Sequence, residues 1–280
     1  KHGIARRRNK IVETKNTIIS SSLKDEKAKT EEVGTENYVV FNHVSFKYAD
    51  GSDYVLKNIS FSVKKGETVA FIGSTGSGKS TLINLIPRLY DATEGEVLID
   101  GVNVKEYDTK ALNKKIGYTP QRGVLFSGTV KSNGNFGDNN ADEETVKKSI
   151  SIAQATNFVS NMGLDGRIAE GGTNVTGGQK QRLSIARAVA RKPDIFIFDD
   201  SFSALDYKTD RKLRTALKKH TVGTTTFIVA QRIGTIKDAD KIIVLDSGDM
   251  VGMGTHEELL KNCPVYKEIA LSQLSEEELS

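Results

Sequence analysis

A phosphate-binding loop is the clearest chemical motif in this sequence. Residues 73–80 read Gly-Ser-Thr-Gly-Ser-Gly-Lys-Ser and match the pattern G-x-x-x-x-G-K-[ST]. In such a loop, backbone N–H groups close around the α- and β-phosphates, Lys79 reaches the terminal phosphates, and the Ser80 hydroxyl can ligate Mg²⁺. A chance glycine- and serine-rich loop is the alternative. The residues expected to contact a nucleotide here are Gly73, Ser74, Thr75, Gly76, Ser77, Gly78, Lys79, Ser80 and Thr81.

Two consecutive carboxylates follow a short apolar segment. Residues 195–198 read Ile-Phe-Ile-Phe and lead directly into Asp199 and Asp200. Ligands of α/β proteins collect at the carboxyl ends of the strands, so Asp199 is expected beside the Mg²⁺ of the nucleotide. The alternative is that the two carboxylates cap a helix at a surface turn.

A second pair of glycines stands at the start of another expected helix. Thr176, Gly177 and Gly178 precede the helix-forming residues 179–191. A hydroxyl and two unhindered N–H groups at a helix start form an anion site that lacks a lysine of its own. Taken alone, an ordinary helix N-cap explains these residues better, but the phosphate loop and the carboxylates accompany them.

These three motifs together closely resemble the nucleotide-binding domain of ATP-binding cassette (ABC) transporters, over about residues 37–272. In the family's terms, residues 73–80 are the Walker A loop, 195–199 are Walker B, and 175–179 correspond to the LSGGQ signature. The resemblance implies that two domains join head to tail, with each ATP between one domain's Walker A loop and the other's signature. The signature residues thereby implied to contact ATP are Thr176, Gly177, Gly178 and Gln179.

Other positions extend the resemblance. Tyr48, at the end of Val-Ser-Phe-Lys-Tyr, corresponds to the aromatic residue that stacks on adenine, with a plain strand tyrosine as the alternative. Gln121 resembles the Q-loop residue that senses Mg²⁺ and water and couples to the membrane domain. Residues 203–206 resemble the D-loop. The resemblance implies ATP and Mg²⁺ as cofactors, and the implied metal ligands are Ser80, Gln121 and Asp199.

The chain departs from the family pattern at two positions that serve the γ-phosphate. Most members place a glutamate where this chain has Asp200, and a histidine where it has Gln231. Asp200 is one methylene shorter, and an amide such as Gln231 cannot become positively charged or relay a proton. Neutral drift could explain either change singly. Together they favour a degenerate site with Asp200, Gln231 and Gln121 as its catalytic residues.

An asymmetric pair of chains follows from this interpretation. The site of this chain is expected to bind ATP tightly and to turn over slowly. Its signature segment would complete a competent site on a second, non-identical half-transporter that carries the glutamate and the histidine. Such a division resembles heterodimeric bacterial multidrug exporters, in which ATP-dependent dimerisation drives efflux.

The elements that must position these motifs alternate along the chain. This alternation implies a mostly parallel sheet flanked by helices, in an α/β protein of the P-loop NTPase type. An N-terminal antiparallel β subdomain and an inserted helical subdomain at about 125–190 complete the expected ABC ATPase fold. Strands are expected at 38–48, 59–63, 68–72, 97–100, 195–198, 226–229 and 241–245. Helices are expected at 80–89, within 145–162, and at 179–191 and 208–220.

Composition agrees with a soluble globular protein of one or two domains. The chain has 280 residues, of which 27% are charged and 37% hydrophobic. Its net charge of +4 is spread along the chain, and no nucleic-acid partner is expected. The single Cys263 cannot form an internal disulfide, which favours a reducing setting. No apolar run reaches the roughly 18 residues that cross a bilayer.

Residues 1–36 differ from the rest because they are basic at first and then polar. Residues 5–14 resemble the cytoplasmic extension of the last transmembrane helix in exporters with a fused membrane domain, and 254–260 resemble their closing segment. The expected organisation is therefore a helix end with a linker (1–36), the nucleotide-binding domain (37–272) and an acidic tail (273–280). The fused transmembrane domain would be missing from this chain, and the domain would lie at the cytoplasmic face of the cell membrane.

Three other functions compete with this interpretation. One is an ATP-gated dimerisation or regulatory module without significant hydrolysis. Another is a cassette ATPase that acts on DNA or ribosomes, although such proteins usually carry a long coiled coil or paired cassettes, and neither pattern is present in the sequence. The third is a stand-alone importer subunit, which would not need the leader at 1–36.

Overall fold

The computed structural model describes residues 37–136 and 141–273. The predicted helix end and linker at 1–36 lie outside the described residues, as does the acidic tail after Gln273. Among the residues described, none of the helices has the length and apolar character needed to cross a membrane.

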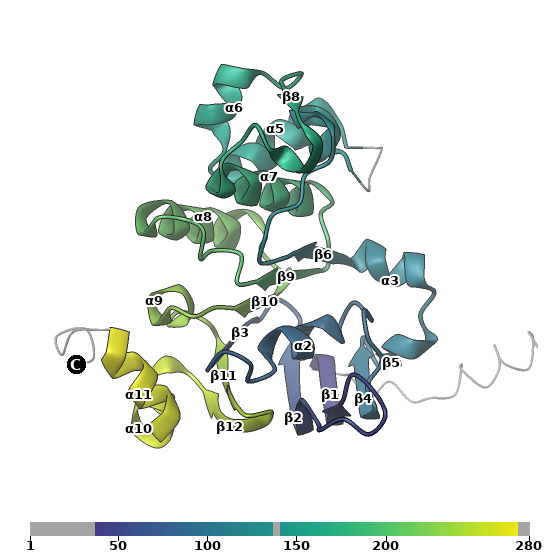
Figure 1. The fold of residues 1–280 in the computed structure, drawn as a ribbon, viewed down its shortest axis with the longest axis vertical. Helices are drawn as coiled ribbons and strands as arrows, with labels where there is room; N and C mark the ends of the chain where they lie inside the picture. The colour runs from purple at the N-terminus through teal and green to yellow at the C-terminus, as the bar shows by residue number, and fades with distance from the viewer. Residues whose placement is uncertain (1–36, 137–140, 274–280) are drawn as a thin grey trace, which may run out of the picture. The chain divides into compact units, whose positions relative to one another are not determined.

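A six-stranded sheet carries the predicted motifs (Figure 1). Its strands are β3 (Thr68–Gly73), β6 (Ile116–Thr119), β9 (Ile195–Asp199), β10 (Thr225–Val229), β11 (Lys241–Asp246) and β12 (Asp249–Gly254). They are arranged in the order β12-β11-β3-β10-β9-β6, and all neighbours pair in parallel except β11 and β12. The mostly parallel sheet expected from the sequence is thereby confirmed.

The parallel register brings four distant segments to one edge of this sheet. The strands β3, β6, β9 and β10 run in the same direction, so their carboxyl ends meet there. The phosphate loop follows β3, Gln121 follows β6, Asp199 ends β9, and Gln231 follows β10. Chain topology alone therefore gathers the candidate site.

A separate antiparallel sheet is formed by the N-terminal part of the described chain. Its strands are β1 (Asn37–Phe46), β2 (Leu56–Lys64), β4 (Glu94–Ile99) and β5 (Val102–Asn103). The order is β2-β1-β4-β5, and every neighbouring pair is antiparallel. This sheet confirms the N-terminal β subdomain of the expected fold class.

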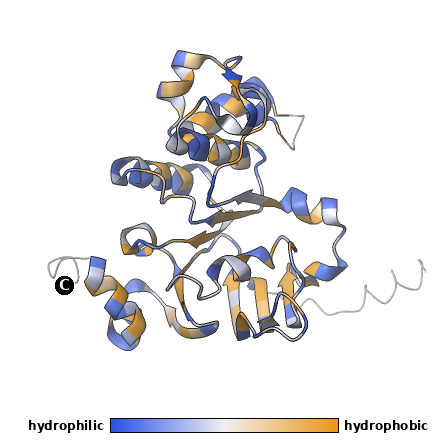
Figure 2. Ribbon diagram, in the orientation of Figure 1, coloured by the Kyte–Doolittle hydropathy of each residue, from blue (hydrophilic) through white to orange (hydrophobic). Residues whose placement is uncertain are grey.

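The six-stranded sheet separates two apolar cores because successive strand side chains point to opposite faces. In β3, Val69 and Phe71 enter one core, whereas Ala70 and Ile72 enter the other. The first core also holds the apolar residues of α2 (Lys79–Asn84) and of the antiparallel sheet, and the second holds those of α7 (Gly177–Ala190). Figure 2 shows the strands of both sheets as largely apolar.

A group of helices lies at one end of the described region (Figure 1). It consists of α4 (Val130–Gly134), α5 (Glu143–Ile152), α6 (Thr156–Met162) and α7, together with the paired strands β7 (Gly128–Thr129) and β8 (Arg167–Ile168). The helix α7 packs against both α4 and α5. Asp142 caps α5 by accepting a hydrogen bond from the backbone N–H of Thr145.

The remaining helices connect the strands or cover the sheet. They are α3 (Thr109–Lys115), α8 (Tyr207–His220), α9 (Ile233–Ile236), α10 (His256–Asn262) and α11 (Pro264–Gln273), with short 3-10 turns η1 (Val104–Glu106) and η2 (Glu170–Gly172). Helices α10 and α11 pack against each other, and α11 also contacts α9 and β3. The side chain of Tyr266 on α11 is fully buried.

The helix predicted at 80–89 ends early, at Asn84. The following N–H groups bond to the carbonyl three residues back, from Leu85 to Leu82 and from Ile86 to Ile83, so the chain tightens into turns. Pro87 disfavours the helical conformation of the residue before it, which explains the stop. The strands β6 and β12 had no counterpart among the predicted elements.

Candidate functional site

The phosphate loop depends on glycine at two positions where a side chain would not fit. Gly73 has a φ of 152°, and a Cβ there would overlap the carbonyl oxygen of Leu245. Gly78 caps α2 in the left-handed conformation, with a φ of 101°, and a Cβ would lie 2.7 Å from Cδ2 of Leu56. These two glycines fix the path of the backbone into the first turn of α2.

Lys79 lies over its own loop. Its ammonium donates hydrogen bonds to the carbonyl oxygens of Gly73 (2.9 Å) and Ser74 (2.7 Å) and contacts Oγ of Ser77 (3.3 Å). The residue is only 9% exposed. Burial lowers the pKa of Lys79, whereas the nearby carboxylates of Asp200 and Asp199 act in the opposite direction. A cation is thus held where the terminal phosphates of a nucleotide are expected.

Ser80 and Asp199 meet directly, although they are far apart in sequence. The hydroxyl of Ser80 donates to Oδ1 of Asp199 over 2.8 Å. On the other side of the same carboxylate, the Tyr118 hydroxyl lies 3.5 Å from Oδ2 and also donates to Oδ1 of Asn84 over 3.0 Å. Tyr118 was not among the predicted site residues. Its place in β6, beside β9, could not be recognised because β6 itself was not predicted.

Asp200 is held by the side-chain amides of Gln121 and Gln231. The Nε2 atom of Gln231 donates to Oδ2 of Asp200 over 2.8 Å, and that of Gln121 donates to the same oxygen over 3.1 Å. The backbone of Asp200 has a positive φ of 47°, a conformation that aspartate adopts more readily than most residues. The three predicted catalytic residues therefore form one hydrogen-bonded group.

The two carboxylates are buried side by side. Asp199 is 7% and Asp200 6% exposed. Burial raises the pKa of both carboxylates, and in each case it is the largest of the effects on the pKa. For Asp200 the N–H donors of Gln121 and Gln231 and the charge of Lys79 act in the opposite direction, and for Asp199 the Ser80 hydroxyl does so. A site with two desolvated carboxylates therefore favours a bound cation.

The residues present fit Mg²⁺. This ion prefers hard oxygen ligands and usually keeps several waters or phosphate oxygens among its six. The Ser80 hydroxyl and the Asp199 carboxylate supply such oxygens at adjacent positions beside the phosphate loop. Gln121, the third predicted ligand, directs its Nε2 atom to Asp200. Ser80 and Asp199 would therefore hold the metal together, and Gln121 stays a predicted ligand through its Oε1 oxygen.

Tyr48 lies beside the first turn of α2. Its hydroxyl is 2.7 Å from Oγ1 of Thr81, and its ring makes edge contacts with Phe46 and Tyr90 at centroid distances of 4.9 and 5.3 Å. The residue is 56% exposed, so part of the ring remains available to a flat ligand. The structure therefore places this predicted contact within reach of the phosphate loop.

The signature segment (residues 175–179) starts α7 with a capping box. The Thr176 hydroxyl accepts from the N–H of Gln179 over 3.3 Å, and Oε1 of Gln179 accepts from the N–H of Thr176 over 2.9 Å. Because α7 and α2 belong to the cores on opposite faces of the sheet, this segment lies apart from the phosphate loop of the same chain. The structure therefore separates the two predicted parts of the ATP site.

Two buried polar contacts connect the Gln121 loop to its neighbours. Nε2 of Gln181 in α7 donates to the carbonyl of Pro120 over 3.0 Å, and the hydroxyl of Ser201 donates to the carbonyl of Thr119 over 2.8 Å. Gln181 is 1% exposed and Ser201 is fully buried. The loop that carries Gln121 is therefore fixed to both the signature helix and the end of β9.

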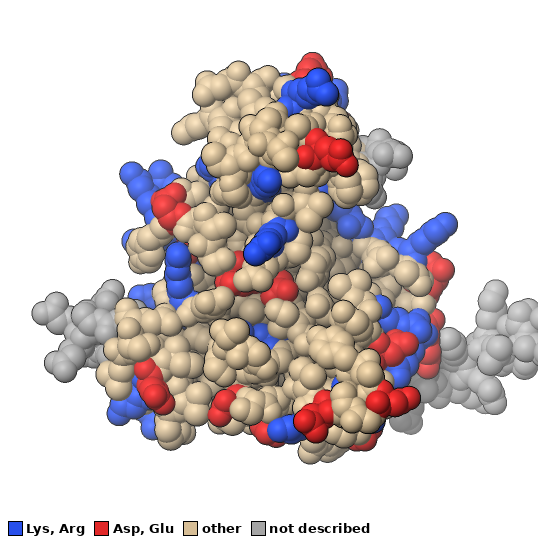
Figure 3. Space-filling model, viewed as in Figure 1, with Lys and Arg blue, Asp and Glu red and all other residues tan. Residues whose placement is uncertain are grey.

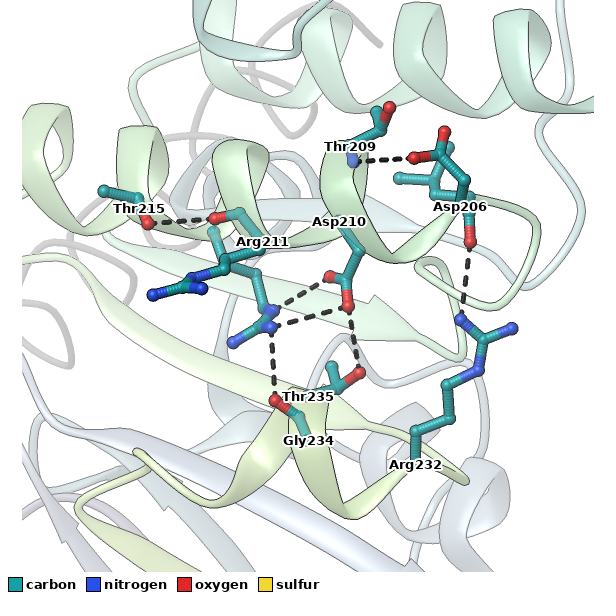
Figure 4. Close-up of polar contacts among 10 residues, drawn as sticks. Asp206, Thr209, Asp210, Arg211, Thr215, Arg232, Gly234 and Thr235 are labelled. Carbon is teal, nitrogen blue, oxygen red and sulfur yellow. Dashed lines mark hydrogen bonds and ion pairs between the residues drawn. The ribbon is translucent and has the colours of Figure 1, made fainter. Parts of the chain in front are cut away.

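The D-loop segment (residues 203–206) is tied to the segment that follows β10. The guanidinium of Arg232 lies 3.4 Å from the carbonyl oxygens of both Leu205 and Ser203. Asp206 caps α8 by accepting from the N–H of Thr209. Figure 4 shows Arg232 reaching from the start of α9 toward the loop before α8.

An ion pair within α8, between Asp210 and Arg214, is hydrogen-bonded to α9 beyond this contact. Arg214 donates to Oδ1 of Asp210 over 2.8 Å and to the carbonyl of Gly234 over 3.2 Å, and Thr235 donates to the same carboxylate over 3.2 Å. In Figure 4 the Asp210 carboxylate points toward Thr235 and Gly234.

Elsewhere on the surface, basic and acidic side chains are interspersed over the face drawn in Figure 3.

Comparison with known proteins agrees with this geometry. The family described as ABC transporter matches residues 56–203. An uncharacterised ABC transporter ATP-binding protein of Mycobacterium tuberculosis is 48% identical over 243 residues, which are 86% of this chain and 42% of the relative. A putative multidrug export ATP-binding/permease protein of Staphylococcus aureus is 46% identical over 230 residues, 81% of this chain and 40% of the relative.

A solved structure is similar over most of the chain. It is a bacterial Atm1-family ABC exporter with ATP bound, with a TM-score of 0.82 and 35% identity, and the match covers 86% of this chain and 42% of that one. The chain thus spans about two fifths of the length of these curated relatives and of this structure. The ABC ATPase fold expected from the sequence is confirmed by this similarity and by the sheet topology.

Proposed function

Because the chain belongs to the ABC transporter family, we propose that it is the ATP-binding domain of an exporter half-transporter whose own site hydrolyses ATP slowly. In this proposal residues 37–272 form the nucleotide-binding domain at the cytoplasmic face of the membrane. Its transmembrane domain lies in a part of the protein outside this chain. Head-to-tail dimerisation on ATP drives the efflux step.

The contact between Asp200 and Gln231 carries the proposal of slow hydrolysis. Phosphoryl transfer depends mainly on positioning and electrostatic stabilisation, and the attacking water must be oriented close to the γ-phosphate. Here Oδ2 of Asp200 already accepts hydrogen bonds from both Gln231 and Gln121, and these amides would compete with a water for the carboxylate. Gln231 in turn has a neutral amide, which cannot carry the charge of a protonated histidine.

The chain's other residues suit tight binding of ATP. Backbone N–H groups of the phosphate loop and the positive end of α2 would surround the α- and β-phosphates, and Lys79 would exchange its carbonyl partners for oxygens of the terminal phosphates. Tyr48 would stack on the adenine. Mg²⁺ held by Ser80 and Asp199 supplies charge neutralisation on the phosphates. Gln231 could add a neutral hydrogen bond to the γ-phosphate.

The position of the signature segment supports a second chain in the working unit. The segment lies across the sheet from the chain's own phosphate loop, so Thr176, Gly177 and Gly178 are available to a nucleotide on a partner. The hydroxyl and the capping box of Thr176 are intact. We propose that the partner is a non-identical half-transporter with a glutamate and a histidine in its own site.

The deciding experiment compares lysine substitutions in the two halves. The full-length half-transporter would be co-purified with its partner and reconstituted in vesicles, and ATP hydrolysis and transport would be measured. We expect Lys79→Ala to leave much of the turnover, whereas the equivalent change in the partner abolishes it. An equal loss of ATP hydrolysis from both changes would refute the proposal that the two sites are asymmetric. Lys57→Ala, at an exposed lysine that pairs with Asp249, is the matched control.

A regulatory module without hydrolysis is the second candidate, and the two amides that bind Oδ2 of Asp200 favour it. In that case ATP would drive dimerisation alone. Single-turnover release of phosphate, measured on this chain with and without the partner, separates the two functions. Release that stays at the background rate with the partner present would establish the regulatory function in place of slow hydrolysis.

A further inference from the structure

The last described residue of α11 reaches the segment that carries Gln231. The Nε2 atom of Gln273 donates to the carbonyl oxygen of Gln231 over 2.8 Å. Oε1 of the same amide accepts from the backbone N–H of Ile233 over 2.9 Å. One side-chain amide therefore binds the backbone on both sides of Arg232, much as a neighbouring strand would.

This contact satisfies a backbone group that lacks a local partner. The first N–H groups of a helix cannot bond within it and need a side chain, water or another partner. Arg232, which precedes α9, provides no side-chain cap. Gln273 supplies the missing acceptor from a different helix, and Ile233, whose N–H it binds, is fully buried.

The body of α11 is well anchored, so Gln273 is not a loose surface group. Tyr266 is fully buried, and its hydroxyl lies 2.6 Å from Nδ1 of His256. Ala270, one turn before the end of the helix, is also fully buried. The amide of Gln273 is therefore presented to the Gln231 backbone by a helix that is packed into the core.

The two ends of Gln231 have different partners. Its backbone carbonyl is bound by Gln273, and its side-chain amide is bound to Asp200. Fixing the carbonyl limits rotation of the backbone around Gln231 and hence the direction of its side chain. Arg232 adds a second restraint on this segment through its contacts with the D-loop segment.

We propose that Gln273 is a positioning residue that holds Gln231 in the orientation needed to contact the γ-phosphate. The inference rests on the proposed function, in which Gln231 faces that phosphate. It adds that the C-terminal helix sets the geometry of the site. Loss of the Gln273 amide would then alter the recognition of ATP and leave the recognition of ADP unchanged, since ADP lacks the γ-phosphate.

The test uses the 280-residue chain and two independent readouts. The first is the affinity for a non-hydrolysable ATP analogue relative to that for ADP, both with Mg²⁺, measured by calorimetry. The second is hydrogen exchange at the Ile233 amide. The variants are Gln273→Ala, which removes both contacts, and Gln273→Glu, which keeps the shape but has no N–H donor. Ser272→Ala is the matched control, since its hydroxyl bonds to Ile269 within α11.

We expect Gln273→Ala to speed exchange at Ile233 and to lower the relative affinity for the ATP analogue, each by about fivefold, as for the loss of one hydrogen bond. Gln273→Glu should lower that affinity as well, because its carboxylate faces the Gln231 carbonyl. In a Gln231→Ala background, Gln273→Ala should have no further effect on nucleotide affinity. Ser272→Ala should match the parent chain in both readouts.

Three outcomes would overturn the inference. Unchanged exchange at Ile233 would show that the clamp is not formed. Equal losses for the ATP analogue and ADP, or a loss that persists in the Gln231→Ala background, would show that Gln273 only stabilises α11. If Gln231→Ala itself left the ratio of the affinities for the ATP analogue and ADP unchanged, the proposed contact of Gln231 with the γ-phosphate would be wrong. Failure of the proposed function can thus be distinguished from failure of the role of Gln273.

Discussion

The side-chain amide of Gln231 donates a hydrogen bond of 2.8 Å to the carboxylate of Asp200. These are the two residues that the sequence motifs predict to depart from the family pattern beside the γ-phosphate. They come from different strand ends, β10 and β9, and lie 31 positions apart in sequence. The two departures therefore form one local arrangement, and a change at either position is expected to depend on the other.

Lengthening Asp200 should restore hydrolysis. We expect Asp200→Glu to raise the rate at this site by about tenfold to a hundredfold, because the added methylene brings the carboxylate closer to the γ-phosphate. The double change Asp200→Glu with Gln231→His should exceed the product of the single effects, since the two side chains are in contact. Phosphate release by the heterodimer, with the partner's site inactivated, measures this. An unchanged rate would show that Asp200 does not limit the site.

Removing the charge of Asp200 should stabilise the free chain near neutral pH. The pKa of Asp200 is raised by folding, so the ionised carboxylate opposes folding above that pKa. The penalty disappears as the pH falls through the raised pKa toward the ordinary value of 3.8. We therefore expect Asp200→Asn to increase Tm at pH 7, with the difference from the parent chain narrowing at acidic pH.

Asp142 serves as a control because folding shifts its pKa downward, in the direction opposite to that of Asp200. The hydrogen bonds from Thr145 lower the pKa of its carboxylate, so its ionised form supports folding above the ordinary value of 3.8. That support is lost as the pH falls through the lowered pKa. Asp142→Asn should therefore reduce Tm at neutral pH and converge with the parent chain only at strongly acidic pH. Thermal unfolding between pH 3 and pH 8, roughly the range that carboxylates and histidine cover, compares the variants.

Thr176 should serve both folding and the partner's nucleotide. Removing its hydroxyl breaks the capping box of α7, so we expect Thr176→Ala to lower the free energy of unfolding by about 1 kcal/mol. In the heterodimer it should also slow the partner's site. Thr176→Ser keeps the hydroxyl and should preserve both properties. Denaturant unfolding of the single chain and ATP hydrolysis by the pair measure the two effects separately.

The buried pair between Asp210 and Arg214 should matter far more than an exposed pair on another helix. The Asp210 side chain is 2% exposed, and Asp210→Ala would leave the partly buried guanidinium without its carboxylate. We expect a loss of about 3 kcal/mol in the free energy of unfolding. Glu143→Ala removes the solvent-exposed pairs with Lys147 and Lys131 and should shift the unfolding midpoint much less. Similar losses from both changes would contradict this ranking.

Local sequence was sufficient to predict most of the strands and the binding motifs. The apolar run before the phosphate loop, the Ile-Phe-Ile-Phe segment before Asp199 and the glycine pair after Thr176 each carry a short-range pattern with a physical reason behind it. The helix after the loop is shorter than predicted, because Pro87 disfavours the helical conformation of the residue before it. The mostly parallel pairing of the strands followed from the alternation of elements.

The sequence by itself predicted which side chains bind phosphate and Mg²⁺, and that Asp200 and Gln231 differ from the family pattern. Only the tertiary structure decided which of these side chains meet. Tyr118 contacts Asp199, and Gln273 holds the backbone of Gln231, because parallel strands and packed helices bring distant segments to one sheet edge. Such contacts depend on strand order and helix packing, which no short stretch of sequence records.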